Sequence, residues 1–158
     1  MIGMEAVWYG EFLRLFQRYP QRWHLIPSGS RPGGNHWEEF RDGAKVRFCC
    51  QDCGHGWTSM KGRVMFWFFL DVFLSEGWIL FQLFGQRCLK CNTNQFENAM
   101  WYPEEVVKVM TNVCNRMAEV YYGFPQCPQR SARRPGRPRN PHNRDLCQAC
   151  FEGVCNER

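Results

Sequence analysis

Three Cys-x-x-Cys pairs constrain this chain more than any other feature of its sequence. They are Cys50 with Cys53, Cys88 with Cys91, and Cys147 with Cys150. Two cysteines separated by two residues fit on one tight turn with both sulfurs facing the same metal ion, and tetrahedral zinc then needs two further ligands. The spacing therefore predicts structural zinc sites assembled from separate turns.

Two complete ligand sets can be formed from these pairs. The first two pairs together supply four sulfurs, and the third has His142 five residues before it and Cys155 five residues after it. We predict two zinc ions per chain, the first bound by Cys50, Cys53, Cys88 and Cys91 and the second by His142, Cys147, Cys150 and Cys155. Cys127 is the substitute ligand for the second ion should His142 not bind.

A disulfide framework is the alternative use of ten cysteines in 158 residues. The first five residues, MIGME, offer neither a basic start nor an apolar run, so no signal peptide is expected. In the reducing cytosol, clustered cysteines are metal ligands more often than disulfides. We therefore expect a cytoplasmic, zinc-binding chain.

The net charge of +5 is concentrated in one segment. Residues 124–141 contain no acidic residue and five arginines, Arg130, Arg133, Arg134, Arg137 and Arg139. Removing these 5 from the 20 basic residues leaves 15 against 15 acidic residues, so the remainder is formally neutral. This Arg/Pro segment is read as an extended linker, and its arginines are candidate contacts for RNA or an anionic membrane surface.

Hydrophobic periodicity divides the rest of the chain into helices and strands. A helix is expected from Glu5 to Tyr19, followed by a turn-rich loop over 26–35. Strands are expected around 45–48, over 62–73 and over 77–84, and their candidates for packing under a helix are Trp57, Phe66, Phe68, Trp78 and Phe81. Residues 64–84 are apolar enough to suggest a membrane span, but Asp71 and Glu76 interrupt them, so two strands are preferred.

The clearest helix runs from Pro103 to Tyr122 and ends at Gly123. The predicted fold is α+β: a small zinc-stabilised antiparallel β-ribbon packed by an N-terminal helix and this long helix, plus a C-terminal zinc knuckle. The expected organisation is a core over 1–123, the Arg/Pro linker over 124–141 and the knuckle over 142–158, which is either packed on the core or only tethered to it.

An enzymatic zinc site is the alternative to these structural ones. His36-Trp37-Glu38 followed by Cys88-x-x-Cys91 is similar to a zinc deaminase arrangement. Arg87 stands where that pattern has proline, and Cys50 with Cys53 would close the open catalytic position. No catalytic residue and no small-molecule substrate are therefore predicted.

Taken together, the motifs resemble the receptor-transporting proteins of the three-CxxC zinc-finger class, which are related to the zygote-arrest proteins. The resemblance covers nearly the whole chain. It rests on Trp8, Glu11 and Phe12, on Cys50-x-x-Cys53 with Trp57 and Ser59, on the segment LFGQRCLKC over 83–91, on Tyr121-Tyr122-Gly123, and on His142 leading into Cys147-x-x-Cys150 with Gly153 and Cys155.

The resemblance implies a non-enzymatic, chaperone-like role in which a cytosolic zinc domain binds odorant-type, taste-type or other G-protein-coupled receptors and promotes their surface expression. It places such a chain at the cytosolic face of the endoplasmic reticulum or plasma membrane. Members commonly carry a C-terminal membrane anchor, and no transmembrane segment is expected within residues 1–158. The alternative that the family suggests is an interferon-type antiviral or translational RNA-binding protein.

Overall fold

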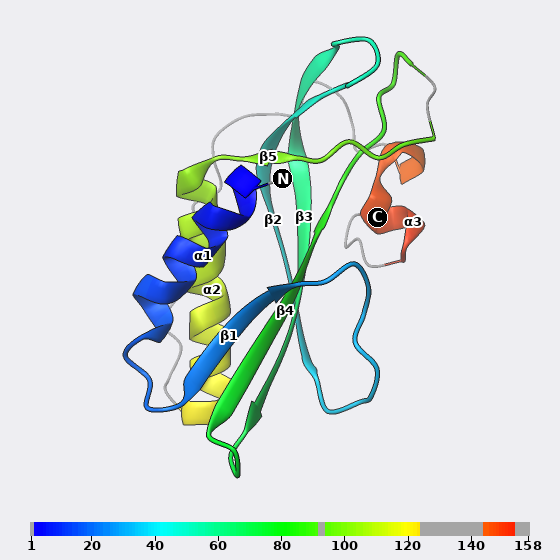
Figure 1. Cartoon of the computed structure of the whole chain (residues 1–158). Coiled ribbons are helices and arrows are strands. Elements are labelled where there is room, and N and C mark those ends of the chain that lie inside the picture. Colours follow the sequence, from blue (N-terminus) through cyan, green and yellow to red (C-terminus); the bar gives the residue numbers. More distant parts are fainter. Residues whose placement is uncertain (1, 92–93, 124–143, 154–158) are drawn as a thin grey trace.

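The computed structural model describes residues 2–91, 94–123 and 144–153. The elements in chain order are α1 (Ile2–Phe16), β1 (Arg22–Pro27), β2 (Glu38–Cys49), β3 (Gly56–Asp71), β4 (Glu76–Phe84), β5 (Met100–Trp101), α2 (Pro103–Tyr122), a 3-10 turn (Arg144–Leu146) and α3 (Gln148–Phe151). The strands form one sheet in the order β1-β4-β3-β2-β5. Helices α1 and α2 lie side by side on one face of this sheet, and the short α3 lies on the other (Figure 1).

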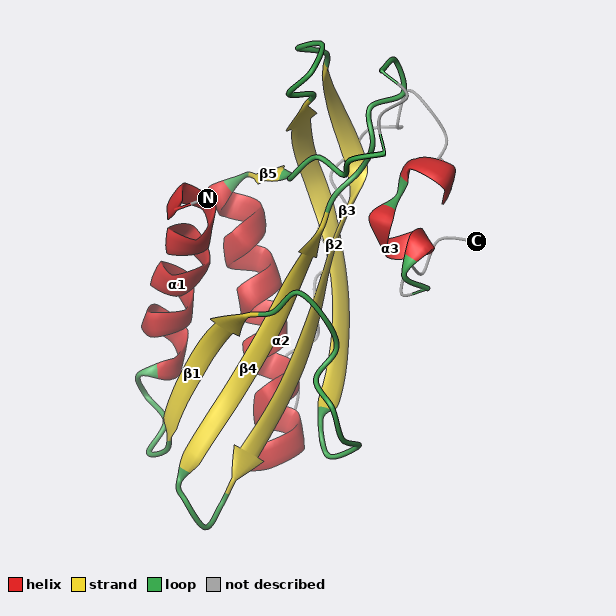
Figure 2. Cartoon of the chain, turned by 45° about the vertical axis from the view of Figure 1, so that its right-hand side comes forward, coloured by secondary structure: helices red, strands yellow, loops and turns green. Residues whose placement is uncertain are grey.

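The sheet is mixed, so the prediction of an antiparallel ribbon is only partly correct. β2 with β3, β3 with β4 and β2 with β5 are antiparallel, whereas β1 runs parallel to β4. Strands joined by a tight turn must be antiparallel, but β1 reaches its partner by a long connection, and this allows the parallel orientation. Figure 2 shows β1 beside β4, which places α1 over that edge of the sheet.

The main core lies between the two long helices and the sheet. Trp8 of α1 is fully buried, and its ring centroid lies 5.2 Å from that of Trp101, 5.8 Å from that of Phe81 and 6.0 Å from that of Phe66. Helix α2 contributes an apolar stripe at steps of three and four residues, namely Val106, Val109, Met110, Val113 and Met117. Aromatic and aliphatic side chains thus fill this layer from both helices and all five strands.

One predicted member of that core lies on the opposite face. Trp78 is half-exposed, and its ring stacks against that of His24 with centroids 6.1 Å apart. Because successive side chains of a strand alternate between faces, Ile79 and Phe81 of β4 point to the helices and Trp78 points away. The prediction placed Trp78 and Phe81 in one layer, but an odd number of positions separates them on β4, so their side chains point to opposite faces.

A smaller core covers part of the face that α1 and α2 leave open. Met65, Trp67 and Phe84 from β3 and β4 are buried there against Cys147 and Ala149. Ala149 belongs to α3, so the C-terminal element packs directly on the sheet (Figure 2).

The apolar run over 64–84 is a strand pair, β3 and β4, joined by a turn. Asp71 Oδ1 accepts hydrogen bonds from the backbone N–H groups of Phe73 and Leu74, at 3.0 Å and 3.1 Å. Among the described residues, no helix is both long and apolar enough to cross a bilayer.

Candidate zinc site

The first Cys-x-x-Cys turn connects β2 to β3. The Cys50 N–H donates to the His55 carbonyl at 2.8 Å, and the Gly54 N–H donates to the Cys50 carbonyl at 2.9 Å. Gly54 has φ +74°, a conformation that glycine adopts without the steric cost of a Cβ atom. The turn buries Cys50 and leaves the neighbouring Cys49 exposed.

The second turn, Cys88 to Cys91, follows β4 and is fixed by a bridge to a later segment. Gln86 and Glu97 exchange two backbone hydrogen bonds of 2.7 Å and 3.2 Å. A Cβ atom on Gly85 would lie 2.2 Å from the Glu97 carbonyl oxygen, so only glycine permits this close approach. The bridge sets where the chain emerges into the second turn.

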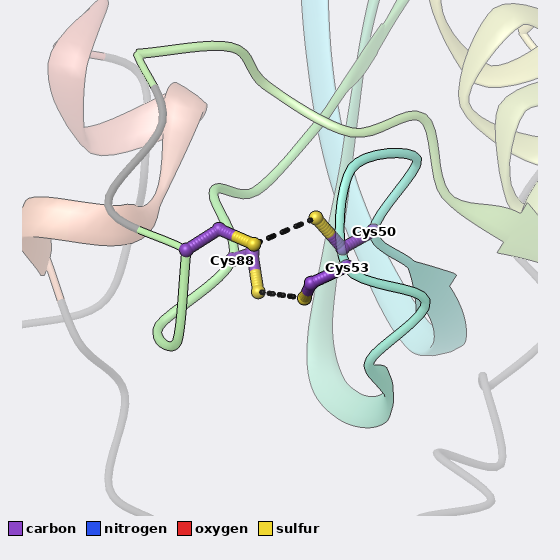
Figure 3. Close-up of side chains that lie close together, drawn as sticks. Cys50, Cys53 and Cys88 are labelled. Atoms are coloured by element: carbon purple, nitrogen blue, oxygen red, sulfur yellow. Dashed lines mark hydrogen bonds between the residues drawn. The ribbon is translucent and has the colours of Figure 1, made fainter.

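The two turns bring four sulfur atoms together. Every Sγ atom of Cys50, Cys53, Cys88 and Cys91 lies within 4.8 Å of the other three. The Sγ distance is 3.6 Å from Cys50 to Cys91 and 3.8 Å from Cys53 to Cys88. Figure 3 shows the three labelled side chains turned toward one another from the two turns.

These distances fit a tetrahedral zinc ion. With Zn–S bonds of about 2.3 Å, neighbouring sulfurs of a regular tetrahedron are about 3.8 Å apart. The donor set is also suitable, because four thiolates are a common ligand set of structural zinc. All four positions of such an ion would be filled by protein, leaving no open position for water or substrate.

Crowding of the thiols alters their acidity. Hydrogen bonding with the Cys91 thiol, assisted by the His55 backbone, lowers the pKa of Cys53 to about 7. Hydrogen bonding with the Cys53 thiol, together with desolvation, raises the pKa of Cys91 well above its ordinary value. Four thiolates repel one another without a cation among them, so metal binding and deprotonation are coupled.

A polar and aromatic layer holds the two turns against each other. Glu97 is buried, and its Oε1 accepts a 3.3 Å hydrogen bond from the N–H of Gln51 in the first turn. Gln86, before the second turn, accepts a 3.1 Å hydrogen bond from Trp57 Nε1 and donates one of 2.8 Å to Ser59 Oγ. The sequence offered no periodicity or spacing that would single out Gln86 or Glu97.

The third pair lies beside this site but outside the four-sulfur cluster. The Arg87 N–H donates to the Leu146 carbonyl at 2.9 Å, and the Gln148 N–H donates to the Gly85 carbonyl at 3.0 Å. Cys147 is buried and Cys150 is half-buried, on a turn whose Gly153 N–H donates to the Cys150 carbonyl at 3.1 Å. The turn that carries the third cysteine pair therefore packs against the end of β4, where the chain leads into the second Cys-x-x-Cys turn.

The remaining predicted site residues lie outside the described residues. These are the two further candidate ligands of the second zinc, the substitute ligand and the five arginines, namely His142, Cys155, Cys127, Arg130, Arg133, Arg134, Arg137 and Arg139. Of the other histidines, His36 packs its ring edge against Phe69, 4.6 Å between centroids, and His55 stacks on Trp57 at 5.6 Å.

Comparison with known proteins identifies curated relatives along most of the chain. Receptor-transporting protein 4 of Mus musculus is 28% identical over 130 residues, covering 80% of this chain and 51% of the relative. Receptor-transporting protein 4 of Homo sapiens is 24% identical over 128 residues, covering 77% and 50%. Receptor-transporting protein 3 of Mus musculus is 24% identical over 165 residues, covering 98% and 34%. The chain thus spans about half, or less, of the length of these relatives.

No solved structure matches the chain. A family model does: the zinc-binding domain of the three-CxxC zinc-ribbon type matches residues 43–153, a range that contains all three cysteine pairs. The match agrees with the resemblance drawn from the motifs and with the sulfur cluster at the end of the sheet. The chain belongs to the three-CxxC zinc-ribbon family of zinc-binding domains.

Proposed function

We propose that the chain is a non-enzymatic, zinc-stabilised accessory protein that binds membrane receptors of the G-protein-coupled class, odorant-type or taste-type, and promotes their transport to the cell surface. The observation that carries this proposal is the similarity to receptor-transporting proteins over 77% to 98% of the chain. Such a protein acts at the cytosolic face of the endoplasmic reticulum or plasma membrane, where newly made receptors present their cytosolic segments.

Two zinc ions stabilise the chain in this proposal. The first is bound by Cys50, Cys53, Cys88 and Cys91, whose sulfurs are already within reach of a single ion. The second is bound by His142, Cys147, Cys150 and Cys155, with Cys127 as the substitute for His142. Both sites use all four positions of the ion, which supports a structural role for the metal instead of a catalytic one.

The proposed function is tested by the surface abundance of receptors. Flow cytometry would compare a panel of odorant-type receptors in cells that express the chain, its Cys88→Ser variant, its Cys49→Ser variant, or none of these. We expect surface abundance to rise with the chain and with Cys49→Ser, because Cys49 is exposed and outside the sulfur cluster. Cys88→Ser removes a zinc ligand and should abolish the rise. A panel on which the zinc-loaded chain has no effect would contradict the proposal.

RNA binding is the second candidate function, as an antiviral or translational regulator. Five arginines between residues 130 and 139, with no acidic residue in that range, favour it because such a segment attracts phosphate. Replacing all five by glutamine should remove RNA retained after crosslinking. Receptor delivery should survive that replacement if the two functions are separate. If no RNA crosslinks to the unaltered chain, the RNA role is excluded.

A further inference from the structure

The turn between β3 and β4 exposes three consecutive large apolar side chains. Val72 is 71% exposed, Phe73 is 101% exposed and Leu74 is 64% exposed. Apolar residues scattered singly over a surface are ordinary, but a contiguous run of them at one point marks a contact with an apolar partner or phase. The turn lies at the end of the sheet remote from the turn that carries Cys50 and Cys53 (Figure 1).

Hydrogen bonds hold the backbone of this turn in one shape. Asp71 Oδ1 accepts from the N–H groups of Phe73 and Leu74. Ser75 has φ +53°, a left-handed conformation that residues other than glycine adopt rarely, and its carbonyl accepts a 3.1 Å hydrogen bond from the Arg22 N–H. The fixed turn keeps its apolar side chains out of both cores, so its shape serves a contact outside the chain.

The residues behind the tip match the order of layers in a membrane leaflet. Asp71 pairs with Glu76 at the base of the turn, and the Glu76 carboxylate is hydrogen-bonded to His24 Nε2. Trp78 is half-exposed and lies two residues further along β4, which is about 7 Å at the rise of a strand. Indole rings favour the headgroup level of a bilayer. An apolar tip followed by Trp78 therefore fits the acyl boundary and then the headgroups.

Positive charge is available at the same end of the molecule. Tyr122, the last residue of α2, donates a hydrogen bond to Gln21, and the next residue, Arg22, is exposed, as is Arg18. The sequence after α2, residues 124–141, adds five arginines and no acidic residue. Apolar side chains beside cations are complementary to an anionic leaflet, which offers hydrocarbon below a negatively charged surface.

We propose that Val72, Phe73 and Leu74 form a membrane-docking tip that enters the boundary between headgroups and acyl chains of an anionic leaflet. Trp78 then lies among the headgroups, and the cysteine end of the sheet points away from the bilayer. Only the identity of the membrane, as the one that holds the transported receptor, rests on the proposed function. Docking without any rise in receptor surface abundance would refute the proposed function and leave the docking tip intact.

The test is flotation of the zinc-loaded full chain with lipid vesicles, which requires no receptor. The vesicles are phosphatidylcholine with about 30 mol% phosphatidylserine, and a second set is phosphatidylcholine alone. We expect saturable binding to the first set that weakens as salt is raised, and binding on the order of tenfold weaker to the second, because the arginines then lose their anionic counterpart.

Variants of the tip make the test specific to the turn. Phe73→Ala should bind the anionic vesicles on the order of tenfold more weakly, because it removes the most exposed ring. Replacing Val72, Phe73 and Leu74 together by serine should abolish flotation. The matched control is Leu13→Ala, which removes a 60% exposed side chain from α1 and should bind like the unaltered chain. Circular dichroism would verify that each variant is folded.

Four results would overturn the proposal. Absence of binding to the anionic vesicles would exclude docking, and undiminished binding by the triple serine variant would place the membrane contact elsewhere. Equal binding to both vesicle sets would exclude recognition of an anionic leaflet. A chain that does not float, but whose mass in solution falls from dimer to monomer on Phe73→Ala, would make the tip a contact between two copies of the chain.

Discussion

The helix-covered core and the cysteine end of the molecule are stabilised in different ways. In the core, fully buried side chains such as Trp8, Phe66 and Phe68 share contacts among α1, α2 and the sheet. At the cysteine end, Cys53 and Lys90 are exposed and Leu89 is 66% exposed. Apolar burial accounts for the first region, whereas the second has little of it and depends on ligands for a metal ion.

This difference teaches where single changes matter. Core energy is distributed over many contacts, so removal of one side chain costs a part of it. The cysteine end concentrates its stabilisation in four sulfur atoms that join segments up to 41 residues apart, so loss of one sulfur affects the whole site. Substitutions in the two regions should therefore differ in the size of their effects.

Loss of a sulfur ligand should have the largest effect. Structural zinc couples on the order of 10 kcal/mol to folding, so Cys88→Ser should lower the melting temperature steeply and reduce its dependence on chelator. Cys49→Ser is the matched control and should melt like the unaltered chain. Thermal unfolding followed by circular dichroism, with and without chelator, checks this. Near-equal melting of the two variants would contradict a metal-dependent end.

Cys147→Ser should cost less than Cys88→Ser. The first site joins turns that are distant in sequence, while the proposed second site closes a local loop whose turn already docks on Gly85 and Arg87 through backbone hydrogen bonds. Urea unfolding of the two variants side by side measures the ranking. The ranking is wrong if both variants lose the same free energy of unfolding.

In the core, Phe66→Ala should lower the free energy of unfolding by about 3–5 kcal/mol, because it leaves a cavity among Trp8, Phe40 and Phe81. Phe73→Ala removes a phenylalanine ring from the exposed β3–β4 turn and should change the free energy of unfolding by less than about 0.5 kcal/mol. Urea denaturation gives both values. A large loss in Phe73→Ala would mean that the turn is covered in solution.

Glu97→Ala should give the smallest of these losses, about 1–3 kcal/mol, because the Gln51 N–H loses its charged acceptor on the buried Glu97. Asp52→Ala, an exposed acidic residue on the same turn, is the control and should be nearly neutral. Zinc retention against a competing chelator would reveal whether the loss is local to the cysteine end. Equal effects of the two variants would exclude Glu97 as a support of the site.

Local signals in the sequence predicted much of this structure. The helix from Pro103 to Tyr122 was predicted at its observed bounds, because Pro at its start and Gly123 at its end mark it chemically. The approach of the first two cysteine pairs followed from the ligand number of zinc. These features depend on residues close in sequence or on the coordination of one ion.

Features that depend on long-range pairing could not be predicted. Arg22–Pro27 is a short segment that ends in proline, and its parallel pairing with β4 depends on the long connection through β2 and β3. The docking of Ala149 on Met65 and Trp67 likewise joins segments about 80 residues apart, for which one sequence carries no signal. The face of the sheet on which Trp78 lies depends on the register of β4 with its neighbouring strands, and the sequence alone does not fix that register.

Native mass spectrometry of the freshly purified chain tests most directly whether zinc stabilises the cysteine end. We expect two zinc ions on the unaltered chain, one on Cys88→Ser and one on Cys147→Ser, because each variant loses a ligand of a different site. A single ion or none on the unaltered chain would contradict this expectation, as would two ions retained by Cys88→Ser.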